Sequence, residues 1–395
     1  MKKDNTNLAH RIITSKILTV ILAVVTLLLT INGVFSLTRI PILSIVTFIT
    51  SGISVAVLVI AIVILIIDLL GWFTKRSKPR MVVVVMAIVS VCSSGIIVGR
   101  QAYLVKKDDL PINILQTAKI DMSTPKENVK INSYGKFNGR NYGLSIWQPK
   151  DNNKLHPVVL NIHGGGWISG NRYEDAPYCK YLSDHGYTTI SIEYPLSTKN
   201  QHLWNQQETF IAKSLIWINK HAKQYGGNPK QLFITGQSAG GNLAINVATK
   251  ANDGTFASKY KTAIPHVKAI SAMIPAVNPQ YLWNHTDPTL RPMLRDMALT
   301  HWNGSPSQYP HRYATNNSAQ VINKNTPPIL MVYGGSDHLV VPEGNKPFLN
   351  KIKNLKLKAK IVAIPYADHT FGLGNGLNYQ IFEALSDRWF NRNNH

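Results

Sequence analysis

The chain has 395 residues, of which 45% are hydrophobic and 16% are charged, a balance that excludes an intrinsically disordered or fibrous protein. Its two cysteines, Cys92 and Cys179, are too few for a disulfide-stapled small domain or a cysteine zinc cluster. The formal net charge is +22, but no zinc-finger, RNP or helix-turn-helix spacing accompanies it, so we expect no nucleic-acid partner.

Three apolar runs lie in the first hundred residues, and only the second of them contains a charged residue, Asp68. Each run is long enough to cross the hydrocarbon core of a membrane as one helix. We predict three transmembrane helices, at 17–38, 43–70 and 81–99, within a membrane region of residues 1–104. A cleaved signal peptide is the alternative for the first run, but no small-residue cleavage site follows it. Asp68 lies near the end of its run and can reach the interface, so we do not expect a functional carboxylate inside the membrane.

Basic residues flank the predicted spans unequally. Eight lie before the first span or between the second and third: Lys2, Lys3, Arg11, Lys16, Lys75, Arg76, Lys78 and Arg80. Four lie on the other side: Arg39, Arg100, Lys106 and Lys107. The positive-inside rule therefore predicts a multi-pass protein of the cell membrane with a cytoplasmic N-terminus and an extracytoplasmic catalytic domain.

The remainder of the chain alternates short apolar runs with amphipathic stretches, the pattern of a mostly parallel sheet covered by helices. We predict a doubly wound α/β domain over 136–395, preceded by a stalk and the first edge strands over 105–135, since no linker or repeat divides the domain. Strands are expected at 157–162, 187–193, 231–235, 267–274, 328–333 and 359–365. Helices are expected at 175–185, 209–225, 242–250 and 381–390.

A loop with three consecutive glycines, HGGGW at 163–167, directly follows the first of these strands. Glycines can present consecutive backbone N–H groups to an oxyanion with no side chain in the way. A phosphate-binding loop would end in Lys-Ser/Thr, which is missing, and a flexible turn is the remaining alternative. We predict Gly165 and Gly166 to be oxyanion-hole donors.

The sequence Gly236-Gln237-Ser238-Ala239-Gly240 lies between a predicted strand and a predicted helix. It is a G-x-S-x-G motif in the strand, turn and helix context of a nucleophile elbow. A side chain at Gly236 or Gly240 would collide with neighbouring backbone in such a tight turn. We predict Ser238 to be the nucleophile and the N–H of Ala239 to be the third oxyanion donor; an ordinary strand-to-helix turn is the alternative.

Residues 276–325 are too many for a simple connection and are rich in Trp, Pro, Met and Tyr. We predict that they form a lid over the site, with surface decoration as the alternative. Together with Trp167, the lid residues Trp283 and Trp302 predict a compact substrate pocket that favours short-chain esters.

Two later strand ends supply a base and its carboxylate, which a serine nucleophile requires. Asp337 follows the predicted strand at 328–333, and His369 follows the strand at 359–365. The order Ser238, Asp337, His369 is the order of an α/β-hydrolase triad. His338 and Asp368 adjoin the chosen residues but in the wrong order, and we expect them to be surface or supporting residues.

From about Val158 to the C-terminus the chain resembles α/β-hydrolase esterases of the hormone-sensitive-lipase type, with the related acetyl-esterase and feruloyl-esterase-like groups. The resemblance rests on HGGGW, on YGGNP at 225–229 leading into GQSAGGNLA at 236–244, on GSD at 335–337 and on His369. It implies Ser238 as nucleophile, His369 as general base and acid and Asp337 as orienting carboxylate. It also implies no metal or organic cofactor. Gln237 stands where many of these esterases have Asp, and EYPL at 193–196 replaces their Asp-Tyr-Arg-Leu.

The expected function is a membrane-anchored serine carboxylic-ester hydrolase that acts on short-chain, acetyl-type esters through an acyl-enzyme. An amidase or peptidase on the same fold, of the arylformamidase or prolyl-oligopeptidase kind, is one alternative. A non-catalytic membrane scaffold is the other, against which the intact triad argues. The oligomeric state is left open.

A run of lysines near the C-terminus comprises Lys351, Lys353, Lys356, Lys358 and Lys360. Such a run predicts a solvated helix face. The alternative is attraction to anionic polymers of the cell envelope, which would make a polysaccharide-linked ester a candidate substrate.

Overall fold

The computed structural model describes residues 16–38, 44–74, 76–151, 153–372 and 375–394, and the chain forms two compact units. The helical unit comprises Met1–Met122 and Ile364–Ile381, and the sheet unit comprises Ser123–Ala363 and Phe382–His395. The segment Ile364–Ile381 thus belongs with the N-terminal helices, although it follows the last strand of the sheet. This segment carries His369.

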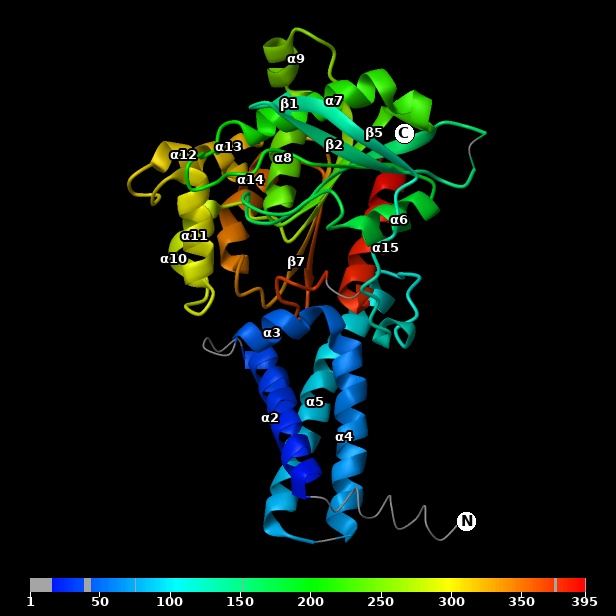
Figure 1. Ribbon diagram of the computed structural model, residues 1–395, viewed down its shortest axis with the longest axis vertical. Helices are drawn as coiled ribbons and strands as arrows, with labels where there is room; N and C mark the ends of the chain where they lie inside the picture. Colours follow the sequence, from blue (N-terminus) through cyan, green and yellow to red (C-terminus); the bar gives the residue numbers. More distant parts are fainter. Residues whose placement is uncertain (1–15, 39–43, 75, 152, 373–374, 395) are drawn as a thin grey trace. The chain divides into compact units, whose positions relative to one another are not determined.

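Within the described residues of the helical unit, three helices are long and apolar enough to cross a membrane, which confirms the predicted number. They are α2 (Lys16–Thr38), α4 (Ser54–Thr74) and α5 (Lys78–Lys107), which run side by side in Figure 1. The protein is therefore membrane-associated. Five of the basic residues used for the orientation lie outside the described part of the chain: Lys2, Lys3, Arg11, Arg39 and Lys75.

The second apolar run does not begin as one regular helix. It starts with the short helix α3 (Ser44–Thr50) and a 3₁₀ turn, η1 (Ser51–Ile53), before α4. The sequence Thr50-Ser51-Gly52-Ile53-Ser54 explains the change, because hydroxyl side chains compete for backbone hydrogen bonds and glycine weakens a helix.

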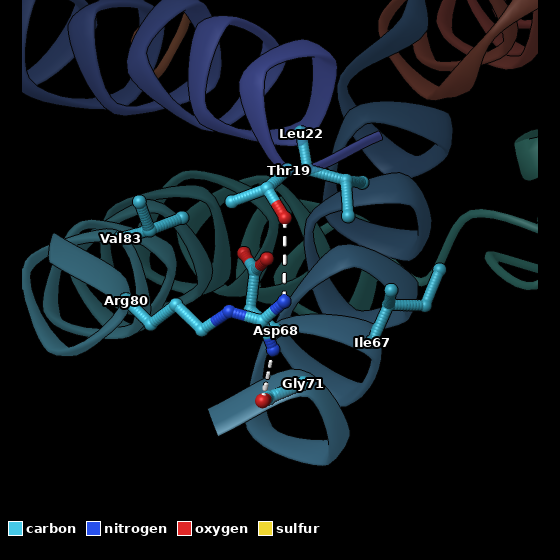
Figure 2. A pocket seen from close by; sticks show the side chains of 7 residues that line it. All are labelled: Thr19, Leu22, Ile67, Asp68, Gly71, Arg80 and Val83. Atoms are coloured by element: carbon cyan, nitrogen blue, oxygen red, sulfur yellow. Dashed lines mark hydrogen bonds between the residues drawn. The ribbon is translucent and has the colours of Figure 1, made fainter. Parts of the chain in front are cut away.

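A polar cluster joins the three long helices (Figure 2). Asp68 on α4 accepts a hydrogen bond from Thr26 Oγ1 on α2 at 3.3 Å. Arg80 on α5 donates to the carbonyl oxygen of Gly71 on α4 and to Thr19 Oγ1 on α2, the latter at 3.4 Å. Asp68 lies one to two turns before the end of α4, and its polar neighbours give it a role in holding the helices together.

The sheet unit is built on eight strands in the order β1-β2-β4-β3-β5-β6-β7-β8. The first two strands, β1 (Val129–Phe137) and β2 (Arg140–Trp147), form an antiparallel edge. Strand β1 begins within the range 105–135 given to the stalk and first edge strands, and β2 lies after it. The others are β3 (His156–Ile162), β4 (Thr188–Ile192), β5 (Gly227–Gln237), β6 (Val267–Met273), β7 (Ile329–Gly334) and β8 (Ala359–Ile364). Strands β4, β3, β5, β6 and β7 pair in parallel.

Helices cover both faces of the sheet, as in a doubly wound fold (Figure 1). On one face, Phe233 of β5 stacks on Phe390 of α15 (Leu377–Arg392), and Thr235 lies 3.5 Å from the hydroxyl of Tyr178 on α6 (Ala176–Asp184). The other face is covered by α7 (Gln207–His221) and α8 (Ala239–Asn252). The predicted strands from 157 to 365 are all present. The apolar runs of β3, β4, β5, β6 and β7 are buried on both sides, whereas β8 at the edge is only partly buried.

Short helices fill the rest of the sheet unit. The predicted lid region holds α10 (Pro279–His285), α11 (Arg291–Trp302), α12 (Pro310–Asn316) and α13 (Ser318–Val321). The described residues also form α9 (Thr255–Tyr260), α14 (Lys346–Asn354), η2 (Gln116–Ala118), η3 (Ala222–Tyr225) and η4 (Pro342–Asn345).

The lysine run does not form one helix face, so that prediction is wrong. Only Lys351 and Lys353 lie on α14, whereas Lys360 lies on β8. Between them the chain turns at Lys356, whose φ of 52° ends the helix. The ammonium of Lys358 donates to Asn393 Oδ1 at 2.7 Å.

Candidate active site

Ser238 occupies the turn between β5 and α8 in a backbone conformation that non-glycine residues rarely adopt, with φ 53° and ψ −118°. Its N–H donates to the carbonyl oxygen of Met273 at 2.9 Å. Its carbonyl oxygen accepts from the N–H groups of Asn242 and Ala276, at 3.1 and 3.2 Å. Hydrogen bonds on both sides therefore hold the strained conformation, and the Ser238 side chain remains half-buried.

The two glycines of the elbow leave no room for a side chain. A Cβ on Gly236 would lie 2.5 Å from the carbonyl oxygen of Gly240 and 2.7 Å from that of Ile162. A Cβ on Gly240 would overlap the carbonyl oxygens of Ile162 and His163. The backbone of the turn thus packs directly on the end of β3, which is the collision expected from the sequence motif.

The loop after β3 has left-handed backbone at Gly165 (φ 102°), Gly166 (φ 59°) and Trp167 (φ 65°). The carbonyl oxygen of Gly165 accepts from Ile168 N, Ser169 N and Ser169 Oγ at 2.9 to 3.1 Å, which closes the turn. Within the described residues, no acceptor lies on the N–H of Gly165 or Gly166. Two neighbouring donors are thus free to bind an anionic oxygen.

Helix α11 covers this loop. The sulfur of Met297 lies only 2.5 Å from where a Cβ on Gly166 would be, so the methionine packs on the glycine. The Trp167 ring stacks on His301, with centroids 5.3 Å apart, and meets the edge of Trp302 at 4.8 Å. Met297 and His301 are site residues that the sequence analysis misses, because only the fold brings α11 to the loop.

The three tryptophans of the predicted pocket have different surroundings. Trp167 is 5% exposed and Trp302 is 1% exposed. Trp302 packs behind Trp167, stacks on Tyr313 and donates to Asn316 Oδ1 at 3.0 Å. Trp283, by contrast, is half-buried under the guanidinium of Arg295, 5.0 Å from its ring centroid.

His163, the first residue of the loop, is fixed by contacts with Tyr194. Its ring stacks on Tyr194, with centroids 4.4 Å apart, and the Tyr194 hydroxyl donates to the His163 carbonyl oxygen at 2.9 Å. Burial lowers the pKa of His163 to about 4, so the ring is neutral near pH 7. A buried neutral histidine packed against tyrosine is suited to a structural role.

Asp337 lies just after β7 and is 3% exposed. Its Oδ1 accepts from the N–H groups of Leu339 at 2.9 Å and Val340 at 2.7 Å. The loop backbone therefore fixes the carboxylate. Because β3, β5 and β7 are parallel, the glycine loop at 163–167, Ser238 and Asp337 all follow strand ends at the same edge of the sheet.

His369 follows β8 by five residues and belongs to the helical unit. Its N–H donates to Asp368 Oδ1 at 2.7 Å. Its ring stacks on Phe48 of α3, with centroids 6.4 Å apart and planes 10° apart. Asp368 and His338, which adjoin the predicted triad residues, are 1% and 7% exposed, so both are buried residues and neither is a surface residue.

A family model, BD-FAE, matches residues 144–352, more than half of the chain. The chain belongs to the BD-FAE family. The matched range of this BD-FAE protein includes the glycine loop at 163–167, Ser238 and Asp337, and it ends before His369. The predicted resemblance to hormone-sensitive-lipase-type esterases is thereby confirmed.

The curated relatives of this BD-FAE protein bear esterase or lipase names. "Probable carboxylic ester hydrolase LipM" of Mycobacterium tuberculosis is 28% identical over 245 residues, which are 61% of this chain and 56% of LipM. Human "Hormone-sensitive lipase" is 26% identical over 179 residues, 45% of this chain and 16% of the lipase. The chain therefore spans little more than half the length of LipM.

Solved structures confirm the α/β-hydrolase fold. A "Bacterial Heroin Esterase" superimposes with a TM-score of 0.58 at 18% identity, covering 75% of this chain and 91% of that protein. The native esterase Est2 of Thermogutta terrifontis superimposes with a TM-score of 0.53 at 21% identity, covering 68% and 93%. At these identities the likeness concerns the fold alone.

Two buried carboxyl groups near α6 and α15 predict how stability depends on pH. Burial raises the pKa of Asp175 to about 7 and that of Glu383 to about 8. An unfolded glutamate loses its proton near pH 4.5, whereas the folded chain keeps the proton on Glu383 up to about pH 8. Within this window the folded state binds more protons, so stability falls as the pH rises.

We therefore expect Glu383→Gln to stabilise the protein increasingly from pH 5 to pH 8, reaching on the order of 3 kcal/mol, and to add no more above pH 8. Thermal unfolding of the full chain in detergent across this range measures the difference. The exposed Glu343 provides a control, because its carboxyl group is not buried, and Glu343→Gln should give no comparable gain between pH 5 and pH 8. A pH-independent difference for Glu383→Gln would contradict the prediction.

Proposed function

We propose that this BD-FAE protein is a membrane-anchored carboxylic-ester hydrolase that uses Ser238, His369 and Asp337 as its catalytic triad. The observation that carries the proposal is the strained backbone of Ser238 at the end of β5, held between glycines that admit no Cβ. Such strain is retained where it positions a reacting group, and a projecting serine at a strand-to-helix turn is suited to nucleophilic attack.

The proposed reaction proceeds through an acyl-enzyme. His369 takes the proton of Ser238 Oγ while that oxygen attacks the ester carbonyl carbon, and then gives the proton to the leaving alcohol. The N–H groups of Gly165, Gly166 and Ala239 bind the oxyanion; the first two have no acceptor among the described residues, and Ala239 is the first residue of α8. Asp337, fixed by its own loop, orients His369, and water releases the acyl group. No step requires a metal ion or an organic cofactor.

Packing at the oxyanion loop favours short acyl chains. Met297 lies against Gly166, and the Trp167 ring stacks on His301 and meets the edge of Trp302. Large side chains so close to the oxyanion donors leave little room for a long acyl chain beside them. We infer that this site lies outside the cytoplasm, because eight basic residues flank the spans on the N-terminal side of the membrane and four flank them on the other side.

The test is hydrolysis of p-nitrophenyl acetate, butyrate and octanoate by the full-length protein in detergent micelles. We expect kcat/KM to fall at least about tenfold from acetate to octanoate, because added methylenes must fit beside Met297 and Trp167. The p-nitroacetanilide with the same acyl group should be hydrolysed far more slowly.

Two other results would contradict the proposal in different ways. Faster turnover of the anilide would indicate the amidase alternative. No turnover, with no labelling of Ser238 by a fluorophosphonate, would indicate the non-catalytic scaffold.

A further inference from the structure

The segment that carries His369 is hydrogen-bonded to the start of the second membrane run, within the helical unit. Thr47 Oγ1 on α3 donates to Asp368 Oδ2 at 2.9 Å. The N–H of Asp368 donates to Ser51 Oγ on η1 at 2.6 Å, and the Ser51 hydroxyl lies 3.4 Å from the Asp368 carbonyl oxygen. Thr47, Ser51 and Asp368 are 3%, 8% and 1% exposed, so water does not compete for these bonds.

Two further contacts flank this pair. Asn378 Nδ2 donates to the carbonyl oxygen of Ser51 at 2.9 Å. Gln101 on α5 donates to the carbonyl oxygen of Pro365 at 3.1 Å and accepts from Ser54 Oγ at 2.8 Å. Gln101 is fully buried. The segment is thus held at three points along its length, at Pro365, Asp368 and Asn378.

Asp368 transmits this attachment directly to His369. Its Oδ2 binds the Thr47 hydroxyl, and its Oδ1 accepts the N–H of His369 at 2.7 Å. The Phe48 ring, one residue after Thr47, lies parallel to the imidazole. The ring of His369 therefore has a partner on α3, and its backbone N–H binds a carboxylate that is itself held by α3.

The polar side chains involved are unexpected in a segment that only anchors a protein. Hydroxyl and amide groups inside apolar spans are costly unless they have partners, and here their partners belong to the His369 segment. Ser51, which binds Asp368, lies in the 3₁₀ turn that interrupts the second run between α3 and α4. A need for the Ser51 hydroxyl to hold the His369 segment would explain why the helix is interrupted at η1.

We propose that the membrane helices are part of the catalytic apparatus, with Thr47, Ser51 and Gln101 as positioning residues that hold the segment of His369. The inference rests on the proposed function, because it takes His369 as the general base. It explains why the chain has more membrane helices than an anchor requires. Turnover should then depend on hydroxyl groups inside the second apolar run.

The experiment uses the full-length protein in phospholipid nanodiscs and measures p-nitrophenyl acetate hydrolysis. Thr47→Val and Ser51→Ala should each lower kcat about 10- to 100-fold with KM changed less than about twofold, because a displaced base costs rate without loss of binding. The pH profile of kcat/KM should also shift, since the surroundings of the base change. Thr47→Ser, which keeps the hydroxyl, should restore wild-type kcat and the wild-type profile.

Thr38 offers a matched control, because among the described residues its hydroxyl binds the carbonyl oxygen of Val34 in its own helix and no residue of the His369 segment. Thr38→Val should leave kcat and the pH profile unchanged. Hydrogen exchange of residues 364–381 provides a readout independent of activity. We expect faster exchange at the amides of Asp368 and His369 in Thr47→Val, and wild-type exchange in Thr38→Val.

The outcomes separate this inference from the proposed function. Normal turnover with unchanged kcat, pH profile and exchange in Thr47→Val and Ser51→Ala would overturn the positioning role alone. A wild-type protein with no turnover and no fluorophosphonate labelling of Ser238 would overturn the proposed function, and the catalytic role of the helices with it.

Discussion

Ser238→Ala is expected to lower kcat for p-nitrophenyl acetate by about 10⁴-fold or more, because no other group can form the acyl-enzyme. The oxyanion loop and the substrate pocket remain, so KM should change little and a small residual rate should persist. Steady-state hydrolysis by the full-length protein measures the loss. Labelling by a fluorophosphonate, which should vanish in the variant, identifies Ser238 as the reacting residue.

Ser214 on α7 is the matched control for this substitution. Its side chain is also a serine hydroxyl in the sheet unit, it is fully buried, and it donates to the carbonyl oxygen of Ile211 in its own helix at 2.7 Å. Ser214→Ala should therefore keep both turnover and labelling. Retained labelling in Ser238→Ala would mean that another residue is the nucleophile.

The sheet unit is predictable from the sequence because its signals are local. Apolar runs bounded by glycine and proline mark β3, β5 and β7, and the side chains that follow these runs lie at one edge of a parallel sheet. The elbow and the glycine loop need no information beyond a few neighbouring residues. Even the collision that requires Gly240 follows from the motif, and the geometry bears it out.

The cover of the site is less predictable. The length and composition of 276–325 indicate a lid, but they do not indicate that Met297 packs on Gly166 or that Trp302 is buried behind Trp167. These contacts depend on the angles at which short helices pack. The hydrophobic periodicity of the sequence predicts a helix but carries no information about those angles. Whether the region moves as a lid stays a prediction.

The attachment of the His369 segment to the membrane helices could not be predicted from the sequence. Thr47 and Asp368 are 321 residues apart, and no local pattern links a hydroxyl in an apolar run to a carboxylate after a strand. The sequence marks Asp368 as a carboxylate beside the chosen histidine, but nothing in it distinguishes Thr47 from the other hydroxyl residues of the apolar run. The sequence does not show that Thr47 and Asp368 bind each other, because only the fold brings them together.

Gly240→Ala is expected to destabilise the protein by about 3 kcal/mol or more and to reduce turnover at least about 100-fold. The added methyl group would overlap the carbonyl oxygens of Ile162 and His163, both of which are backbone atoms that cannot rotate away. Relief requires α8 to move from the end of β3, which carries Ser238 and the N–H of Ala239 out of position. Thermal unfolding and fluorophosphonate labelling of the full-length variant measure the two effects.

Gly254 separates the effect of collision from that of backbone strain. Its φ is 85°, yet nothing lies within 4 Å of the position of a Cβ there. Gly254→Ala should cost about 1 kcal/mol from its left-handed backbone and leave turnover and labelling unchanged. If Gly240→Ala behaved like Gly254→Ala, the close packing of the elbow on β3 would not be what holds Ser238, and the strained turn would have to be maintained by its hydrogen bonds to Met273 and Ala276.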